Sequence, residues 1–161
     1  MKVLFMCTAN SCRSILSEAM FNHLAPEGFQ AVSSGSFPKG QVLPRSLSTL
    51  QAAGIRTEGL YSKGNDAFEG SPPDVVITVC DKAAGESCPV YFGPALKAHW
   101  GLEDPSDVDG DEASIQAAFD ATLRTIATRC RAFFALPFAD LDPGELKAEL
   151  ERIALLQAEQ A

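Results

Sequence analysis

Short apolar segments separated by longer amphipathic ones predict a protein of alternating strands and helices. Residues 3–6, 30–33, 74–79 and 97–100 are short, β-leaning segments bounded by polar or glycine residues, and each is predicted to be a strand. In the third segment, Val75, Val76 and Ile77 form a continuous apolar run. Such a run is typical of a parallel strand that is covered on both faces.

Apolar residues at three- and four-residue steps predict the helices. Leu16, Met20 and Leu24 share one face of a helix that follows the first strand, and a second helix is predicted to open at Pro44 and to end at Gly54. The longest predicted helix spans residues 112–134, and its apolar face consists of Ile115, Phe119, Leu123, Ile126, Cys130 and Phe133. We therefore assign Cys130 to the core.

The last predicted helix begins at Asp142-Pro143-Gly144-Glu145, which supplies a cap, a first-turn proline and a capping-box acid. It is predicted over about 143–159, as an element appended to one domain that spans residues 1–161. Helices that alternate with short strands predict an α/β fold, with a four-stranded parallel sheet and helices on both faces. Ligands bind beyond the carboxyl ends of such strands, where Cys7 and Cys80 are both expected to emerge.

Composition and charge narrow the classes of function. The 161 residues are 46% hydrophobic, and no apolar run approaches the roughly 20 residues of a membrane span. The N-terminus lacks a signal-peptide pattern, so a cytoplasmic protein is expected. The net charge of −8 argues against nucleic acid or a membrane as a partner. Five cysteines in such a chain favour redox or nucleophilic roles over a disulfide framework.

The segment Cys-Thr-Ala-Asn-Ser-Cys-Arg-Ser, residues 7–14, joins the first predicted strand to the first helix. A Cys-x5-Arg loop there can direct its N–H groups at an oxyanion, and the helix N-terminus adds positive potential that lowers the pKa of Cys7. Arg13 offers a planar fork for phosphate-like oxygens, and Ser14 is predicted to cap the helix. The predicted oxyanion-binding residues are Thr8, Ala9, Asn10, Ser11, Cys12, Arg13 and Ser14. The alternative is a buried cysteine with an arginine nearby by chance.

This loop resembles the signature loop of the low-molecular-weight protein tyrosine phosphatase family, and most closely its arsenate reductase branch, with Ala9 where members usually carry glycine. The resemblance extends to about Phe134. It implies that Cys7 is the nucleophile, that Arg13 clamps the oxyanion and that Asp104, before Pro105, is the general acid. Phosphatases of the family place an aromatic residue after that proline. Ser106 stands there instead, which favours a small inorganic substrate.

Cys80 and Cys88 flank a loop of small and polar residues, and with Cys7 they fit a thiol relay. The arsenate reductase branch resembles this chain at all three cysteines, although seven residues between Cys80 and Cys88 are one more than is usual there. The resemblance implies reduction of arsenate to arsenite through a Cys7 adduct and a Cys7/Cys80/Cys88 disulfide relay. Taken singly, Cys80 reads as a buried strand-end residue, and a zinc site with Cys88 is a further alternative.

Such a relay requires an external dithiol reductant, for which thioredoxin is the expected partner and glutaredoxin with glutathione, or another small thiol, the alternative. A structural potassium ion at Asn10, Glu18, Ser33 and Asp66 is a further expectation from the resemblance. Cys12 is expected to pack under the loop, or to trap Cys7 as a protective disulfide. Two other functions stay open: a phosphatase on the same scaffold, and a non-catalytic oxyanion- or metal-binding regulator.

Overall fold

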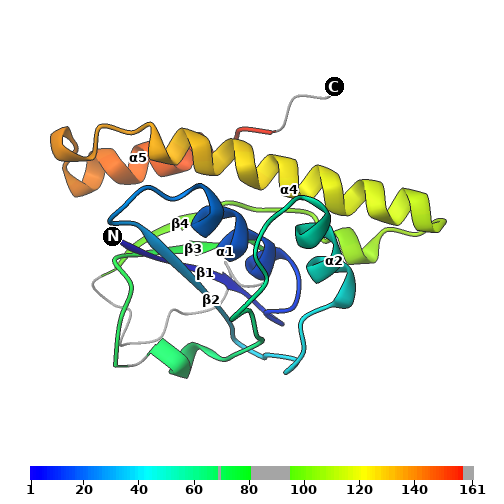
Figure 1. Ribbon diagram of the computed structural model, residues 1–161. Helices are drawn as coiled ribbons and strands as arrows, with labels where there is room; N and C mark the ends of the chain where they lie inside the picture. Colours follow the sequence, from blue (N-terminus) through cyan, green and yellow to red (C-terminus); the bar gives the residue numbers. More distant parts are fainter. Residues whose placement is uncertain (69, 81–94, 158–161) are drawn as a thin grey trace.

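The computed structural model describes residues 1–68, 70–80 and 95–157. Its sheet contains the four predicted strands, β1 (Lys2–Cys7), β2 (Gln30–Gly35), β3 (Val75–Thr78) and β4 (Leu96–His99), all parallel and in the order β2-β1-β3-β4 (Figure 1). Leu4 in the central strand β1 pairs with Val32 on one side and with Val76 on the other. The carboxyl ends of all four strands therefore meet at one edge of the sheet.

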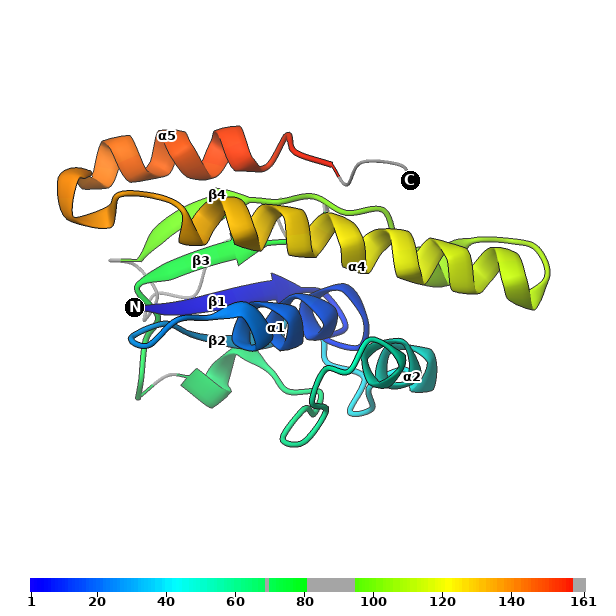
Figure 2. The ribbon, with the colours of Figure 1, turned by 45° about the horizontal axis from the view of Figure 1, so that its top comes forward.

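The helices are α1 (Arg13–Leu24), α2 (Pro44–Ala52), α4 (Glu112–Phe134) and α5 (Pro143–Ile153), with short 3-10 helices η1 (Asn65–Phe68), η3 (Pro105–Asp107) and η4 (Phe138–Asp140). Helices α1, α4 and α5 lie on the same face of the sheet (Figure 2). The predicted α/β fold with a parallel sheet is confirmed, and the long helix has the predicted bounds.

The two faces of the sheet have different cover. Under the long helices, Phe5 packs against Phe21 and Trp100, with ring centroids 5.8 and 6.1 Å apart. On the opposite face, Leu4, Met6 and Val76 pack against Phe68 of η1, so this face carries the shorter helical element. Alternate residues of β1 thus point into two separate cores, as the two-residue period of a strand requires.

The C-terminal helix α5 ends earlier than predicted, at Ile153 instead of about residue 159, and residues 158–161 lie outside the described part. The carbonyl of Leu156 accepts a hydrogen bond of 2.9 Å from Arg129 Nε, which directs the chain toward α4. The predicted capping box is present, with Asp142 and Glu145 bonded in both directions. Because Leu150 and Ile153 are fully buried, α5 completes the core and is not merely appended.

Among residues 1–68, 70–80 and 95–157, no helix combines the length and the apolar character that crossing a bilayer requires.

Candidate active site

The carbonyl groups of the loop after β1 point toward the segment 36–43. They accept hydrogen bonds from residues 36–43: Ser36 N to Cys7 O (3.3 Å), Phe37 N to Thr8 O (2.9 Å), Lys39 N to Ala9 O (3.0 Å) and Leu43 N to Ser11 O (3.0 Å). In a planar trans peptide the following N–H points the opposite way from the carbonyl. The loop's N–H groups therefore turn away from this scaffold, which is the arrangement an oxyanion requires.

Asn10 determines the curvature of the loop. It is fully buried and has a φ of +48°, the left-handed region that Asn tolerates better than most residues. Its side-chain oxygen accepts from Lys63 N at 2.9 Å, and its amide donates to Ser14 Oγ at 2.8 Å and to Ser33 Oγ at 3.0 Å. Ala9, where the family usually has glycine, does not need a positive φ here.

The cap of α1 differs from the prediction, and the sequence does not reveal the role of Gly35. The prediction that Ser14 caps α1 is wrong: Cys12 is the N-cap residue and makes no side-chain capping bond, while Ser14 lies inside the helix and accepts from Asn10. Gly35, at the end of β2, packs directly under the loop, and a Cβ there would lie 2.5 Å from Thr8 O. Only glycine fits this close approach, which no signal in the sequence marks.

Cys7 and Cys80 meet where β1 and β3 end. Val79 N donates to Met6 O at 2.9 Å, which keeps the two strand ends aligned, and the side chains of Cys7 and Cys80 share a hydrogen bond. Thr8 Oγ1 lies 3.6 Å from Cys80 Sγ. Cys7 is 4% exposed and Cys80 2%. The first two sulfurs of the predicted relay are therefore in contact beneath the surface.

The pKa of Cys7 is shifted upward, whereas the sequence predicts a downward shift. The hydrogen bond with Cys80, and then burial, raise the pKa of Cys7 above its ordinary value, while the charge of Arg13 and the backbone N–H of Thr8 lower it. The sequence reveals only the groups that lower the pKa of Cys7, because it does not show that Cys80 lies against Cys7.

Arg13 and Asp104 face each other across the carboxyl edge of the sheet. Arg13 Nη1 donates to Leu102 O at 3.0 Å, and Nη2 lies 3.5 Å from Asp104 Oδ2. The other carboxylate oxygen, Asp104 Oδ1, accepts from Ser106 N at 2.9 Å and from Ser106 Oγ at 2.6 Å. Ser106 thus holds the expected acid in place.

A cavity of about 480 Å³ lies above these groups, and Arg13, Cys80, Leu102, Asp104 and Asp107 are among its walls. The structure brings Cys80, Arg13 and Asp104 to one concave surface, and Cys7 is not among the residues that line it. Cys88 lies outside the described residues, so its position relative to Cys80 stays a prediction.

Cys12 and Cys130, the other described cysteines, are both buried. Cys12 is 5% exposed, and burial raises its pKa to about 12. Cys130 is fully buried in α4, as expected, and its pKa is likewise raised to about 12 by burial. Trp100 packs below the acid loop and donates from Nε1 to Leu150 O at 2.9 Å.

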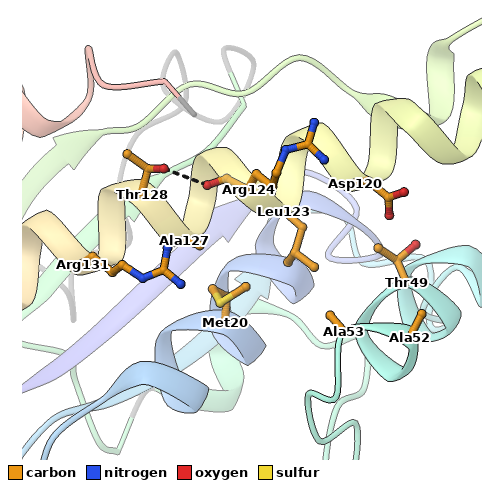
Figure 3. Close-up of a pocket in the computed structure, with 10 residues that line it drawn as sticks. All are labelled: Met20, Thr49, Ala52, Ala53, Asp120, Leu123, Arg124, Ala127, Thr128 and Arg131. Atoms are coloured by element: carbon orange, nitrogen blue, oxygen red, sulfur yellow. Dashed lines mark hydrogen bonds between the residues drawn. The ribbon is translucent and has the colours of Figure 1, made fainter. Parts of the chain in front are cut away.

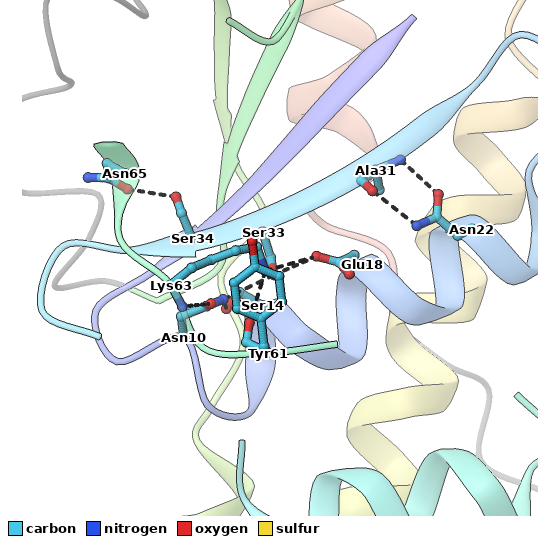
Figure 4. Close-up of polar contacts among 10 residues, drawn as sticks. All are labelled: Asn10, Ser14, Glu18, Asn22, Ala31, Ser33, Ser34, Tyr61, Lys63 and Asn65. Atoms are coloured by element: carbon cyan, nitrogen blue, oxygen red, sulfur yellow. Dashed lines mark hydrogen bonds and ion pairs between the residues drawn. The ribbon is translucent and has the colours of Figure 1, made fainter. Parts of the chain in front are cut away.

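Three of the four residues expected around a potassium ion come together next to the loop (Figure 4). Ser33 Oγ donates to Glu18 Oε1 at 2.7 Å and accepts from Asn10. The sequence reasoning missed Lys63, whose Nζ lies 3.6 Å from Glu18 Oε1 and 3.4 Å from Ser33 Oγ. Asp66, in η1, makes no hydrogen bond or ion pair with these groups in the part of the chain that the structure describes. The potassium ion itself stays a prediction.

A larger cavity lies elsewhere. It has a volume of about 560 Å³ and lies between α1, α2 and α4, with Met20, Leu123, Asp120 and Arg124 among its lining residues (Figure 3). Neither Cys7 nor Arg13 reaches it, so size alone does not locate the chemistry. Among the described residues, no three His, Cys, Asp or Glu side chains are grouped as a metal site.

The fold and this loop define a class of protein. Residues 2–151 match the family model for low molecular weight phosphotyrosine protein phosphatases, and the chain belongs to that family. The match includes most of α5, beyond the predicted limit near Phe134.

Among the similar proteins are arsenate reductases. That of Bacillus subtilis strain 168 is 28% identical over 131 residues, which are 81% of this chain and 93% of the relative. The structure of an arsenate reductase in its phosphate-binding state matches with a TM-score of 0.69 and 26% identity, covering 83% of this chain and 96% of that one. A thioredoxin-dependent arsenate reductase of Corynebacterium glutamicum matches with a TM-score of 0.56 and 26% identity, over 81% of this chain and 61% of that chain.

Proposed function

We propose that this protein reduces arsenate to arsenite through a thiol relay that begins at Cys7. The contact between Cys7 and Cys80 carries the proposal. Phosphoester cleavage requires a nucleophile, an oxyanion clamp and an acid, but it does not require a second thiol in contact with the first. Reduction does need a second thiol to deliver two electrons and form one disulfide, and a cysteine in contact with Cys7 supplies that thiol within the chain.

The first step is attack on arsenic. As arsenate enters the loop, the Cys7 proton passes to an arsenate oxygen, and the thiolate forms a bond to arsenic. Arg13 and the loop's N–H groups hold the remaining oxygens. Asp104 donates a proton to the leaving oxygen, which departs as water. Its position opposite Arg13 supports this role.

The second step transfers the electrons. The Cys80 thiolate attacks the Cys7 sulfur and the sulfur–arsenic bond breaks, with its electron pair going to arsenic, which leaves as arsenite. The product is a Cys7–Cys80 disulfide. The Cys88 thiolate then attacks Cys80, which frees Cys7 and leaves a Cys80–Cys88 disulfide.

An external dithiol restores the enzyme, and thioredoxin is the proposed partner, with glutaredoxin and glutathione as the alternative. The thioredoxin-dependent relative supports this choice. Each turnover starts from reduced thiols, which fits a cytoplasmic location.

The decisive measurement is arsenite release in the presence of thioredoxin, thioredoxin reductase and NADPH, with and without each component. We expect sustained release only with the full system and none from Cys7→Ser. Cys130→Ala serves as the control, because Cys130 lies in α4 and has no step in the relay. Hydrolysis of an aryl phosphate without any arsenite release would instead favour the phosphatase.

The phosphatase reading retains specific support as a side activity. Cys7, Arg13 and Asp104 are the groups that phosphoester cleavage needs, and the family is one of phosphatases. Water can then resolve the phosphocysteine without Cys80. We propose slow hydrolysis of small aryl phosphates beside the reductase reaction.

A further inference from the structure

The side chain of Lys63 lies beneath the oxyanion loop. Lys63 as a whole is 9% exposed, and its ammonium donates to Tyr61 O at 2.9 Å and lies over the Tyr61 ring, 4.4 Å from the centroid. Toward the protein interior the same ammonium meets Glu18 and Ser33 (Figure 4). A lysine ammonium placed so deeply needs this set of oxygen partners, because burial disfavours an unpaired charge.

The hydrogen bonds around Ser33 Oγ form a closed set. A hydroxyl has one donor and two acceptor positions. Here it donates to Glu18 Oε1 at 2.7 Å and accepts from Asn10 Nδ2 at 3.0 Å and from Lys63 Nζ at 3.4 Å. This pattern is satisfied when Glu18 is a carboxylate and Lys63 an ammonium.

Lys63 also reaches the loop directly. Its backbone N–H donates to Asn10 Oδ1 at 2.9 Å, so Lys63 contacts the Asn10 side chain at the oxygen and, through Ser33, at the amide. Asn10 is the one non-glycine residue with positive φ among those described. The conformation of the oxyanion loop therefore depends on both ends of Lys63.

We propose that the ammonium of Lys63 is a built-in cation for this site: it balances Glu18 and holds Asn10, and with it the oxyanion loop, in the binding conformation without any metal ion. Lys63 is thus a positioning residue. A potassium ion does not fit beside it, because the ammonium already occupies the oxygens of Glu18 and Ser33. For turnover the proposal rests on the proposed reductase function, but for oxyanion binding it stands by itself.

The effects on protonation agree with this pairing. Burial raises the pKa of Glu18, and the charge of Lys63 opposes that rise. Burial lowers the pKa of Lys63, and Glu18 opposes that change in turn. Each charge therefore opposes the effect of burial on the other.

The test replaces the tethered cation with a free one. Lys63→Ala leaves a space bounded by Glu18 Oε1, Ser33 Oγ and Tyr61 O, oxygens of the kind that hard cations bind. Two readouts are compared: arsenite release, and protection of Cys7 from iodoacetamide by inorganic phosphate, measured by mass spectrometry. We expect both to weaken about tenfold or more, because small misplacements of binding groups are costly. K⁺ or methylammonium should restore them in part.

Two controls sharpen the result. Lys63→Met keeps the volume of the side chain without its charge, so it should be equally impaired and should not respond to added cations. Lys97→Ala removes an exposed lysine on β4 and should leave both readouts unchanged. The unsubstituted protein should behave alike in K⁺ and in choline at equal ionic strength, a measurement that does not depend on any variant folding.

Three outcomes would overturn the proposal: several-fold activation of the unsubstituted protein by K⁺, phosphate protection in Lys63→Ala equal to that of the parent, or a loss that neither cation reduces. If the parent releases no arsenite but the protection assay behaves as expected, the proposed function fails and the role of Lys63 stands.

Discussion

Arg13 holds the acid loop at two points, with Nη1 on the carbonyl of Leu102 at 3.0 Å and Nη2 at 3.5 Å from the carboxylate of Asp104. The residue proposed to clamp the oxyanion is therefore also the residue that contacts the proposed acid. An oxyanion that enters the loop competes with Asp104 for the same guanidinium. Binding and acid positioning are coupled through this one side chain.

Arg13→Lys should lower kcat/KM by about 100-fold or more, since loss of a transition-state donor has that effect. Lysine keeps the charge but cannot contact Leu102 and the oxyanion through a planar fork. Steady-state kinetics with arsenate and with an aryl phosphate provide the measurement. Arg45→Lys, in α2, is a suitable control. A variant within a few-fold of the parent would remove Arg13 from the transition state.

Asp104→Asn should slow the first chemical step on the order of 10²–10⁴-fold without weakening phosphate binding. The amide keeps the shape of the side chain but has no proton to give to the leaving oxygen. Single-turnover cleavage of an aryl phosphate reports this step directly. If the rate does not change, the acid is another residue of the loop, with Glu103 and Asp107 next in order.

The pH dependence of Cys7 alkylation tests its contact with Cys80. Because the pKa of Cys7 is raised, its thiolate fraction near pH 7 is small. Alkylation of Cys7 by iodoacetamide should therefore increase as the pH rises above 7. Cys80→Ala removes the largest cause of the rise, so the profile should move to lower pH. Cys130→Ala should not move it. A profile that is identical in Cys80→Ala would contradict the contact.

The relay predicts different behaviour for the two resolving cysteines. Cys80→Ser should stop arsenite release, because no sulfur remains to displace arsenic from Cys7, while aryl phosphate hydrolysis persists. Cys88→Ser should release about one arsenite per enzyme and then stall as a Cys7–Cys80 disulfide. A burst experiment without reductant, with disulfides mapped by mass spectrometry, distinguishes them. Multiple turnover of Cys88→Ser with thioredoxin would eliminate the three-cysteine relay.

Gly35→Ala should impair oxyanion binding while the core remains folded. Its Cβ would lie 2.5 Å from Thr8 O and 2.9 Å from Asn10 N, both backbone atoms of the loop, so the loop must move. Phosphate protection of Cys7 from alkylation should weaken. Gly70→Ala is the matched control, since a Cβ there meets nothing within 4 Å. Equal protection in both variants would show that the loop tolerates the displacement.

The sequence was sufficient for features that depend on neighbours along the chain. The strand-loop-helix at Cys7, the bounds of α4 and the capping box of α5 follow from local patterns, and all are present. Features that depend on tertiary contacts could not be predicted from the sequence. Lys63 and Gly35 carry no local signal, and the pKa of Cys7 depends on Cys80, which lies 73 positions away and comes close only through strand pairing.

The alignment of β1 and β3 also has a kinetic consequence. Cys7 ends β1 and Cys80 follows the hydrogen-bonded neighbour β3, so the backbone itself keeps the second thiol next to the first. Well-oriented groups in one molecule reach effective molarities on the order of 10⁵ M. A thiol dissolved at millimolar concentration cannot compete with such a neighbour for an adduct on Cys7. In the proposed relay, the strand register therefore protects the Cys7 adduct from capture by small thiols and leaves the external reductant to act at the end of the cycle.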